Sequence, residues 1–138
     1  MEFQKFRKDL NERTVFVSIN GTIGNVAFYN GEPIVLGKSA CYFNLASNIS
    51  KNFIKLILQS PYFKLYSSTQ ATGSTIKNLG LAAMNSFLIP LPPLCEQERI
   101  VTRVDKLVVI CNSLSAMLDS KRQIEVTIAE SLVEQVLA

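Results

Sequence analysis

The sequence predicts an α+β fold, in which a small antiparallel-sheet domain with short helices precedes a long C-terminal coiled-coil helix. Positions 14–45 contain short β-branched and aromatic runs separated by turn residues. Helical patterns interrupted by proline follow at 50–66. Residues 96–138 contain neither glycine nor proline. Strands and helices thus occupy separate stretches of the chain, as is typical of α+β proteins.

Length and composition bound the class of protein. The chain has 138 residues and is 48% hydrophobic, which is enough for one domain with a buried core and argues against overall disorder. It contains no histidine, and this excludes Ser-His-Asp and Cys-His catalysis, histidine zinc sites and imidazole acid-base chemistry.

The spacing of the cysteines and the length of the apolar runs predict a cytoplasmic protein. Cys41, Cys95 and Cys111 are too far apart for a CxxC pair, so we expect reduced thiols in a cytoplasmic protein. No apolar run is long enough to cross a membrane, and the charged start does not resemble a signal peptide. We therefore expect a soluble protein without a membrane partner.

The net charge of +3 divides unevenly along the chain. Residues 1–95 carry nine basic and four acidic residues, whereas residues 96–138 carry five and seven. The two parts are therefore expected to meet different partners. A basic balance of this size favours nucleic acid only weakly, because an ordinary solvated surface has the same composition.

The elements follow in order from the start of the chain. Residues 1–13 are polar, alternate in charge and lack an apolar period, so we expect either a frayed, disordered leader or the remnant of something longer. Asn20-Gly21 and Asn30-Gly31 separate apolar runs and predict type I′ hairpin turns, which need positive φ at both central residues. The predicted strands are Thr14–Ile19, Ile23–Tyr29, Ile34–Leu36 and Cys41–Leu45.

Two helices are predicted after the sheet. Ser50 is placed to cap a helix through Phe53–Leu58, and Pro61 ends this helix and begins a second one. Residues 67–78 are small and polar and predict a surface loop. A short helical segment at 79–85 and a strand at 87–89 are expected before the prolines of the 90–93 segment.

The final segment carries a coiled-coil pattern. Apolar residues recur at spacings of four and three, which is the a/d seam of a heptad repeat, and such a helix needs a partner to bury its stripe. The register fails at Lys121 and Glu125 and resumes in a shifted phase from Ile124. The predicted helix-partner residues are Ile100, Val104, Leu107, Cys111, Leu114 and Leu118.

Apparent catalytic motifs do not hold. Gly37-Lys38-Ser39 resembles the end of a phosphate-binding P-loop, but Gly31 lies one residue too early and the intervening residues are apolar. Asp119-Ser120-Lys121 has the spacing of a nuclease motif without a supporting upstream aspartate. The loop at 70–78 is more informative, because it offers hydrogen-bonding side chains around Gly73 that suit phosphate oxygens and base edges.

Four blocks of the sequence resemble the specificity subunit of type I restriction-modification enzymes, specifically the later part of one target-recognition domain and the helix after it. The IPLPPL-x-EQ-x-x-I block leading into a long helix is the most specific of them. The blocks, in order, are Ser18–Asn25 (SINGTIGN), Leu58–Pro61 (LQSP), Ala71–Leu79 (ATGSTIKNL) and Ile89–Val101 (IPLPPLCEQERIV).

The resemblance implies a non-catalytic function. In this family two target-recognition domains, separated by paired antiparallel helices, each read half of a split double-stranded DNA sequence. The helices also dock methyltransferase (M) subunits, which bring S-adenosylmethionine, and the restriction (R) subunit supplies ATP-driven cleavage with Mg. The resemblance implies that this chain itself binds no cofactor and works in a bacterial or archaeal cytoplasm.

The resemblance also assigns domains and contacts. It covers the chain from Thr14 onward, leaves residues 1–13 as the leader, and implies a partial target-recognition domain at 14–93 and a helix for dimerisation and subunit docking at 94–138. Lys38 and Lys77 are expected to contact phosphate. The expected DNA-binding residues are Asn20, Thr22, Lys38, Gln70, Thr72, Gly73, Ser74, Thr75 and Lys77.

The chain departs from the family pattern in three ways. It has at most one recognition domain and one helix, we expect that domain to lack its opening portion, and Asn25 stands where the family often has a basic residue. We therefore expect a fragment, a truncated gene product or a half-subunit that rebuilds the paired helices as a homodimer. The alternative is a protein-interaction module on a coiled coil that does not bind DNA.

Overall fold

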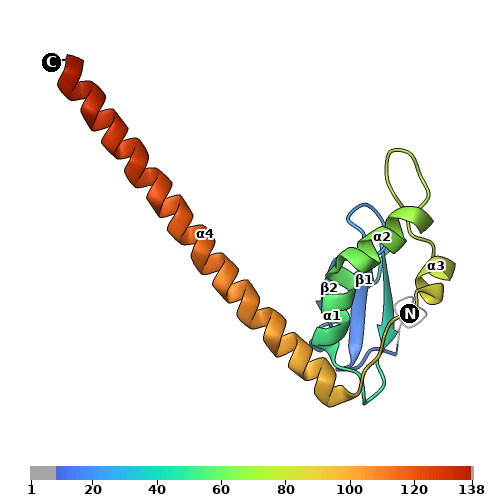
Figure 1. Cartoon of the computed structure of the whole chain (residues 1–138). Coiled ribbons are helices and arrows are strands. Elements are labelled where there is room, and N and C mark those ends of the chain that lie inside the picture. Colours follow the sequence, from blue (N-terminus) through green and yellow to red (C-terminus); the bar gives the residue numbers. More distant parts are fainter. Residues whose placement is uncertain (1–8, 138) are drawn as a thin grey trace. The chain divides into compact units, whose positions relative to one another are not determined.

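The computed structural model describes residues 9–137, so part of the expected leader, residues 1–8, lies outside the described residues. The chain divides into two units with the boundary between Val101 and Thr102. The first unit contains three antiparallel strands and three short helices, and a long helix runs to the end of the described chain. The predicted α+β class is confirmed (Figure 1).

The sheet is built around a buried central strand. β1 (Thr14–Ser18) pairs with β2 (Val26–Phe28) on one side and with β3 (Ala40–Asn44) on the other, both antiparallel. Val17 of β1 lies opposite Val26 and Cys41, and its side chain is fully buried. This order brings the end of β1 and the starts of β2 and β3 to one end of the sheet.

Both predicted type I′ turns are wrong. Among the described residues only glycines have positive φ, so neither Asn20 nor Asn30 adopts the conformation that this turn requires. The β1–β2 connection is instead a longer loop, closed where Gly24 N donates to Ser18 O at 2.9 Å. Since β2 and β3 both pair with β1 and not with each other, Asn30-Gly31 does not join a hairpin.

Two predicted strands are also absent from the described chain. Ile34–Leu36 is irregular, and Val35 is 70% exposed. Pro33, directly before this segment, provides no N–H for a ladder, and the segment pairs with neither outer edge of the sheet. Phe87–Ile89 is irregular as well, because Phe87 packs as a single residue into an aromatic cluster.

The helix starts follow the predicted chemistry. α1 (Lys51–Gln59) is capped by Ser50, whose Oγ accepts from Phe53 N, and Pro61 occupies the first turn of α2 (Pro61–Gln70). α2 continues through 67–70, where a loop was expected, and the hydroxyl groups of residues 67–69 donate to helix carbonyls three residues earlier. α3 (Leu81–Ser86) is the short helix expected near 79–85.

The core lies between the sheet and the helices. Phe53, Ile54 and Leu58 of α1 are buried with Val15 and Val17 of β1. Phe63 of α2 is fully buried, and its ring centroid lies 4.9 Å from that of Phe87. This aromatic packing compensates for the small size of the three-stranded sheet.

Residues just before β1 are bound to the domain. Arg13 donates from Nε to Leu45 O at 2.9 Å, and from its second terminal nitrogen to the carbonyls of Ala46 and Ile49. Asn44 Nδ2 donates to Asp9 O at 2.8 Å. The described part of the expected leader, residues 9–13, is therefore hydrogen-bonded to the end of β3 and to the β3–α1 connection.

α4 (Leu94–Leu137) begins inside the first unit, where Gln97 is 2% exposed. Gln97 Oε1 accepts from Ser50 N at 2.9 Å, and Gln97 Nε2 donates to Pro92 O at 2.8 Å and Asn48 O at 3.3 Å. One side chain thus joins the first turn of α4 to the cap of α1. Ile100 packs against the same core.

Candidate nucleic-acid interface

Two loops that are far apart in the sequence are joined at one end of the sheet. Gly21 N donates to Lys77 O at 2.9 Å, and Leu79 N donates to Ile19 O at 2.8 Å. Figure 1 shows the two loops at the same end of the domain. Because these are backbone bonds, they position the loops independently of which side chains the loops carry.

The neck of the second loop is paired on both sides. Thr72 and Asn78 exchange two backbone hydrogen bonds of 2.9 and 2.8 Å, and Asn78 also forms a bridge with Asn20. Residues 73–77 are therefore the tip of a short arm whose base is held by paired backbone. An arm held in this way loses little conformational entropy when it binds a ligand.

A third segment lies beside these two. Ile19 N donates to Ser39 O at 2.9 Å, so the turn that contains Lys38 is adjacent to the first loop. We call these three segments together, residues 19–25, 37–39 and 71–79, the loop end. It is built from the end of β1, the start of β3 and the chain between α2 and α3.

The loop end is positively charged. Lys38 and Lys77 are exposed there, and none of its residues is acidic. The wider stretch 33–95 contains no aspartate or glutamate at all. Arg13 and Lys51, by contrast, bind backbone carbonyls within the domain. Lys55 on α1 and Lys64 on α2 are also exposed, so the loop end carries two of the exposed lysines and no acidic residue.

The predicted DNA-binding residues all lie at or beside this loop end. Gln70 is the last residue of α2 and is exposed. Thr22 is exposed, and its Oγ1 accepts from Asn25 Nδ2 at 3.3 Å. The remaining exposed members of the predicted set are Lys38, Thr72, Gly73, Ser74, Thr75 and Lys77.

Asn20 is placed differently from the others. Its side chain is only partly accessible, and its Oδ1 is buried without a hydrogen-bond partner among the described residues. Asn20 also forms the backbone bridge to Asn78. It therefore joins the two loops, and its oxygen is not presented to a ligand.

Gly73 has a reason within the arm itself. Its φ is +100°, and a Cβ built there would lie 2.3 Å from Ile76 O, far inside contact distance. From the sequence, Gly73 was interpreted as allowing DNA to approach the backbone closely. The structure adds a second reason for glycine, because the turn of the arm leaves no room for a side chain at this position. Only glycine fits this position without moving the backbone.

Gly73→Ala is expected to open the neck of the arm. A strained φ together with a backbone clash costs about 1–3 kcal/mol, which can be relieved by breaking the Thr72–Asn78 pair. We expect the amides of Thr72 and Asn78 to exchange hydrogen about tenfold faster, or more, when measured by NMR. Gly80→Ala is the matched control, because Gly80 has an ordinary φ of −60° and open space around it. Unchanged protection in Gly73→Ala would contradict this account.

One functional candidate was missed by the sequence interpretation. Ile76 is 62% exposed at the tip of the arm. Its signal in the sequence is a single β-branched apolar residue within an otherwise small and polar loop. That signal is weak, because isolated apolar residues are common on protein surfaces.

The described part of the chain contains three free cysteines, one of them buried. Burial raises the pKa of the Cys41 thiol, which favours the protonated and unreactive form. Cys95 and Cys111 are exposed. Across residues 9–137 no group of histidine, cysteine and acidic side chains is placed to hold a metal ion.

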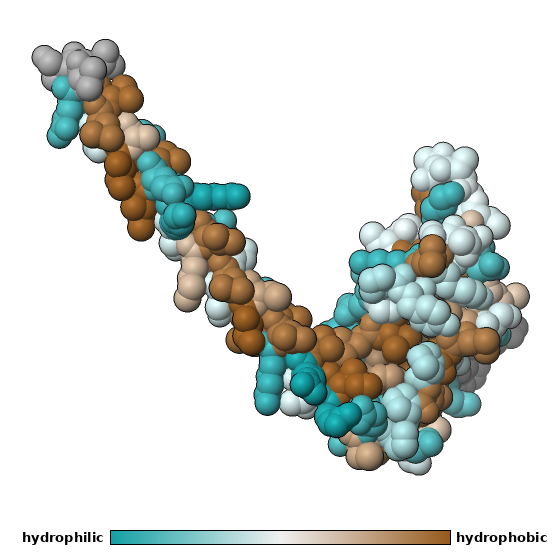
Figure 2. All heavy atoms as spheres, in the orientation of Figure 1, coloured by the Kyte–Doolittle hydropathy of each residue, from teal (hydrophilic) through white to brown (hydrophobic). Residues whose placement is uncertain are grey.

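The second unit presents apolar side chains along most of α4, as Figure 2 shows. Seam residues Leu107, Leu114 and Leu118 are 55–60% exposed. Cys111 is also exposed, whereas Val104 is half-buried. None of the described helices is both long and apolar enough to span a membrane. The seam from 107 to 118 is therefore uncovered in the isolated chain.

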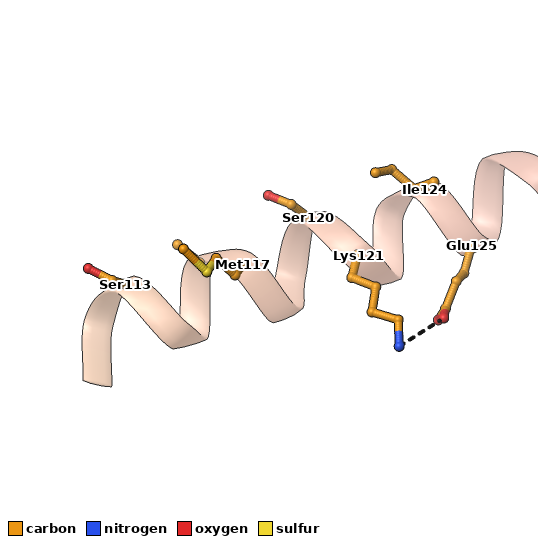
Figure 3. A pocket seen from close by; sticks show the side chains of 7 residues that line it. Ser113, Met117, Ser120, Lys121, Ile124 and Glu125 are labelled. Atoms are coloured by element: carbon orange, nitrogen blue, oxygen red, sulfur yellow. Dashed lines mark ion pairs between the residues drawn. The ribbon is translucent and has the colours of Figure 1, made fainter. Parts of the chain in front are cut away.

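The seam is interrupted by an ion pair. Lys121 Nζ lies 3.6 Å from Glu125 Oε1, and both side chains are well exposed, so the pair contributes little stability. Lys121 and Glu125 also line a shallow groove on α4, and the apolar stripe continues there at Ile124. Figure 3 shows Lys121 and Glu125 pointing away from the edge formed by Ser113, Met117, Ser120 and Ile124.

Comparison with known proteins identifies similar chains. Residues 2–125 match the model of a family described as type I restriction modification DNA specificity domain. The EcoAI specificity subunit of Escherichia coli is 28% identical over 101 residues, which cover 73% of this chain and 17% of that protein. The StySPI specificity subunit of Salmonella potsdam is 29% identical over 113 residues, covering 72% and 24%.

A third similar protein is a type I restriction enzyme specificity subunit of Haemophilus influenzae. It is 30% identical over 121 residues, which cover 82% of this chain and 29% of the relative. The chain therefore spans between 17% and 29% of the length of these curated relatives.

Proposed function

The chain belongs to the type I restriction modification DNA specificity family, and from this premise we propose that it recognises a DNA sequence through the loop end. Its role is non-catalytic: it directs methyltransferase and restriction subunits to their site. S-adenosylmethionine, ATP and Mg belong to those partner subunits, and this chain supplies sequence recognition and a docking helix.

One observation carries the proposal. Three segments from distant parts of the chain meet at one end of the sheet, with Lys38 and Lys77 exposed and no acidic residue among them. Lysine side chains suit phosphate oxygens, and the threonine and serine hydroxyls of the arm suit both phosphates and base edges. A basic, hydrogen-bonding arm on a paired base is well matched to duplex DNA.

Lys77→Ala is expected to weaken DNA binding through loss of a phosphate contact. Affinity for duplex DNA at 50–200 mM salt should fall about three- to tenfold, and the slope of log K against log salt should decrease by about one. Fluorescence anisotropy across a salt series measures both quantities.

Lys55→Ala is the matched control for this experiment. Lys55 is an exposed lysine on α1, outside the loop end, and its loss removes the same charge. Equal losses in the two variants would indicate a general charge effect and would remove the assigned role of Lys77. No binding of the parent chain to mixed duplex at 50 mM salt would instead favour a protein-interaction module.

α4 carries the second part of the proposal. Its seam is exposed from Leu107 to Leu118, and residues 96–138 carry seven acidic and five basic residues. We assign this seam to a second helix, supplied by another copy of the chain. Two copies related by a two-fold axis would form the paired helices on which M subunits dock and would suit a palindromic split site.

A further inference from the structure

The arm contains an apolar side chain that the domain does not use. Ile76 is 62% exposed, although the neighbouring apolar residues Leu79 and Ile19 are 0% and 6% exposed. The residues on either side of Ile76, Thr75 and Lys77, are exposed polar residues. Ile76 therefore adds nothing to the core and stands alone among hydrogen-bonding groups.

The arm holds Ile76 in place. Its carbonyl oxygen lies 2.3 Å from the position that a Cβ on Gly73 would take, so the backbone at Ile76 folds back against the glycine. One residue further on, Lys77 O accepts from Gly21 N at 2.9 Å. The position of Ile76 is thus set by tight backbone contacts on both sides, and its side chain is left in solvent.

The paired base and the chemistry of the arm suit one groove of DNA. Thr72 and Asn78 make the arm two chains wide at its base, and the major groove of B-DNA admits a two-stranded ribbon. In that groove the only apolar group on a base edge is the C5-methyl of thymine. An aliphatic side chain flanked by a hydroxyl and an ammonium group suits a thymine methyl beside the phosphate backbone.

We infer that Ile76 is a specificity-determining residue, which contacts a thymine C5-methyl group in the major groove. This inference rests on the proposed DNA-recognition function and adds one thymine to the recognised sequence. In this arrangement the Lys77 side chain contacts a phosphate of the DNA backbone beside that thymine and does not read the base sequence. A wedge inserted between base pairs is a different mechanism, and the experiment below separates the two.

The test begins with the full chain and a random duplex library. Bound sequences are selected, and each thymine of the enriched site is replaced in turn by deoxyuridine, which lacks only the methyl group. We expect one position at which deoxyuridine weakens binding by the parent about fourfold, the value for one buried methyl group. In Ile76→Ala the same replacement should have no effect.

Controls make each outcome decisive. Ile76→Val keeps a branched side chain, so its DNA binding should remain sensitive to the thymine methyl group. Leu88→Ala removes another apolar side chain, which is 80% exposed, and should leave the sensitivity to the methyl group unchanged. If deoxyuridine weakens binding of the parent and of Ile76→Ala equally at every position, the thymine contact is overturned. It is also overturned if 2-aminopurine fluorescence shows that Ile76 unstacks the bases, because a wedge between base pairs is then the mechanism. If no sequence is enriched, the proposed DNA-recognition function itself fails.

Discussion

Leu107→Asp is expected to convert the helix-paired assembly into monomers while the domain stays folded. In the isolated chain Leu107 is 57% exposed, so an aspartate there costs the monomer little. Between paired helices the same side chain would be buried, and an unpaired buried carboxylate costs several kcal/mol, which weakens association more than 100-fold. Sedimentation equilibrium at micromolar concentrations measures the change in mass, and circular dichroism monitors folding.

Asn112→Asp is the matched control for the seam. Asn112 is exposed on α4 and lies outside the a/d positions. Its replacement introduces an aspartate with the same negative charge as in Leu107→Asp. We expect its assembly to resemble that of the parent. A parent chain that remains monomeric at all concentrations, or a Leu107→Asp variant of unchanged mass, would contradict the pairing of α4 with a second copy.

Gln97→Ala is expected to destabilise the first unit by about 3 kcal/mol. The side chain is 2% exposed, and its removal leaves the N–H of Ser50 and the carbonyl of Pro92 without their partner. The Ser50 N–H lies at the cap of α1, so the loss affects both helices that Gln97 joins. Urea denaturation followed by circular dichroism measures the free energy of unfolding.

Gln59→Ala provides the comparison for Gln97. Gln59 is exposed at the end of α1, and its truncation should change the free energy of unfolding by less than about 0.5 kcal/mol. If Gln97→Ala has the same free energy of unfolding as the parent, the hydrogen bonds of Gln97 do not stabilise the packing of α4 against the α1 cap.

Features that depend on near neighbours were predicted correctly. Ser50 caps α1 and Pro61 starts α2, because the hydrogen bond of a cap and the fixed φ of proline involve only the adjacent residues. Gly73 was singled out in the loop, and its φ of +100° is a property of the local backbone. The long helix likewise follows from a stretch without glycine or proline.

Features that depend on distant pairing were predicted poorly. Asn20-Gly21 has the composition of a hairpin turn, yet Asn20 forms a bridge with Asn78, far along the chain. Ile34–Leu36 has the composition of a strand, yet it pairs with neither outer edge of the β2-β1-β3 sheet. Strand propensity becomes a strand only where the tertiary structure supplies a pairing partner.

By itself the sequence determined the α+β class, the family blocks, the helix caps and the residues to consider at a DNA interface. Only the tertiary structure decided that the loops at 19–25 and 71–79 meet, that Gln97 is buried, and that Ile76 is not. The physical reason is that caps, turns and periodicity depend on residues a few positions apart. Burial and loop pairing depend on which distant backbone groups close the chain, and no local pattern encodes that choice.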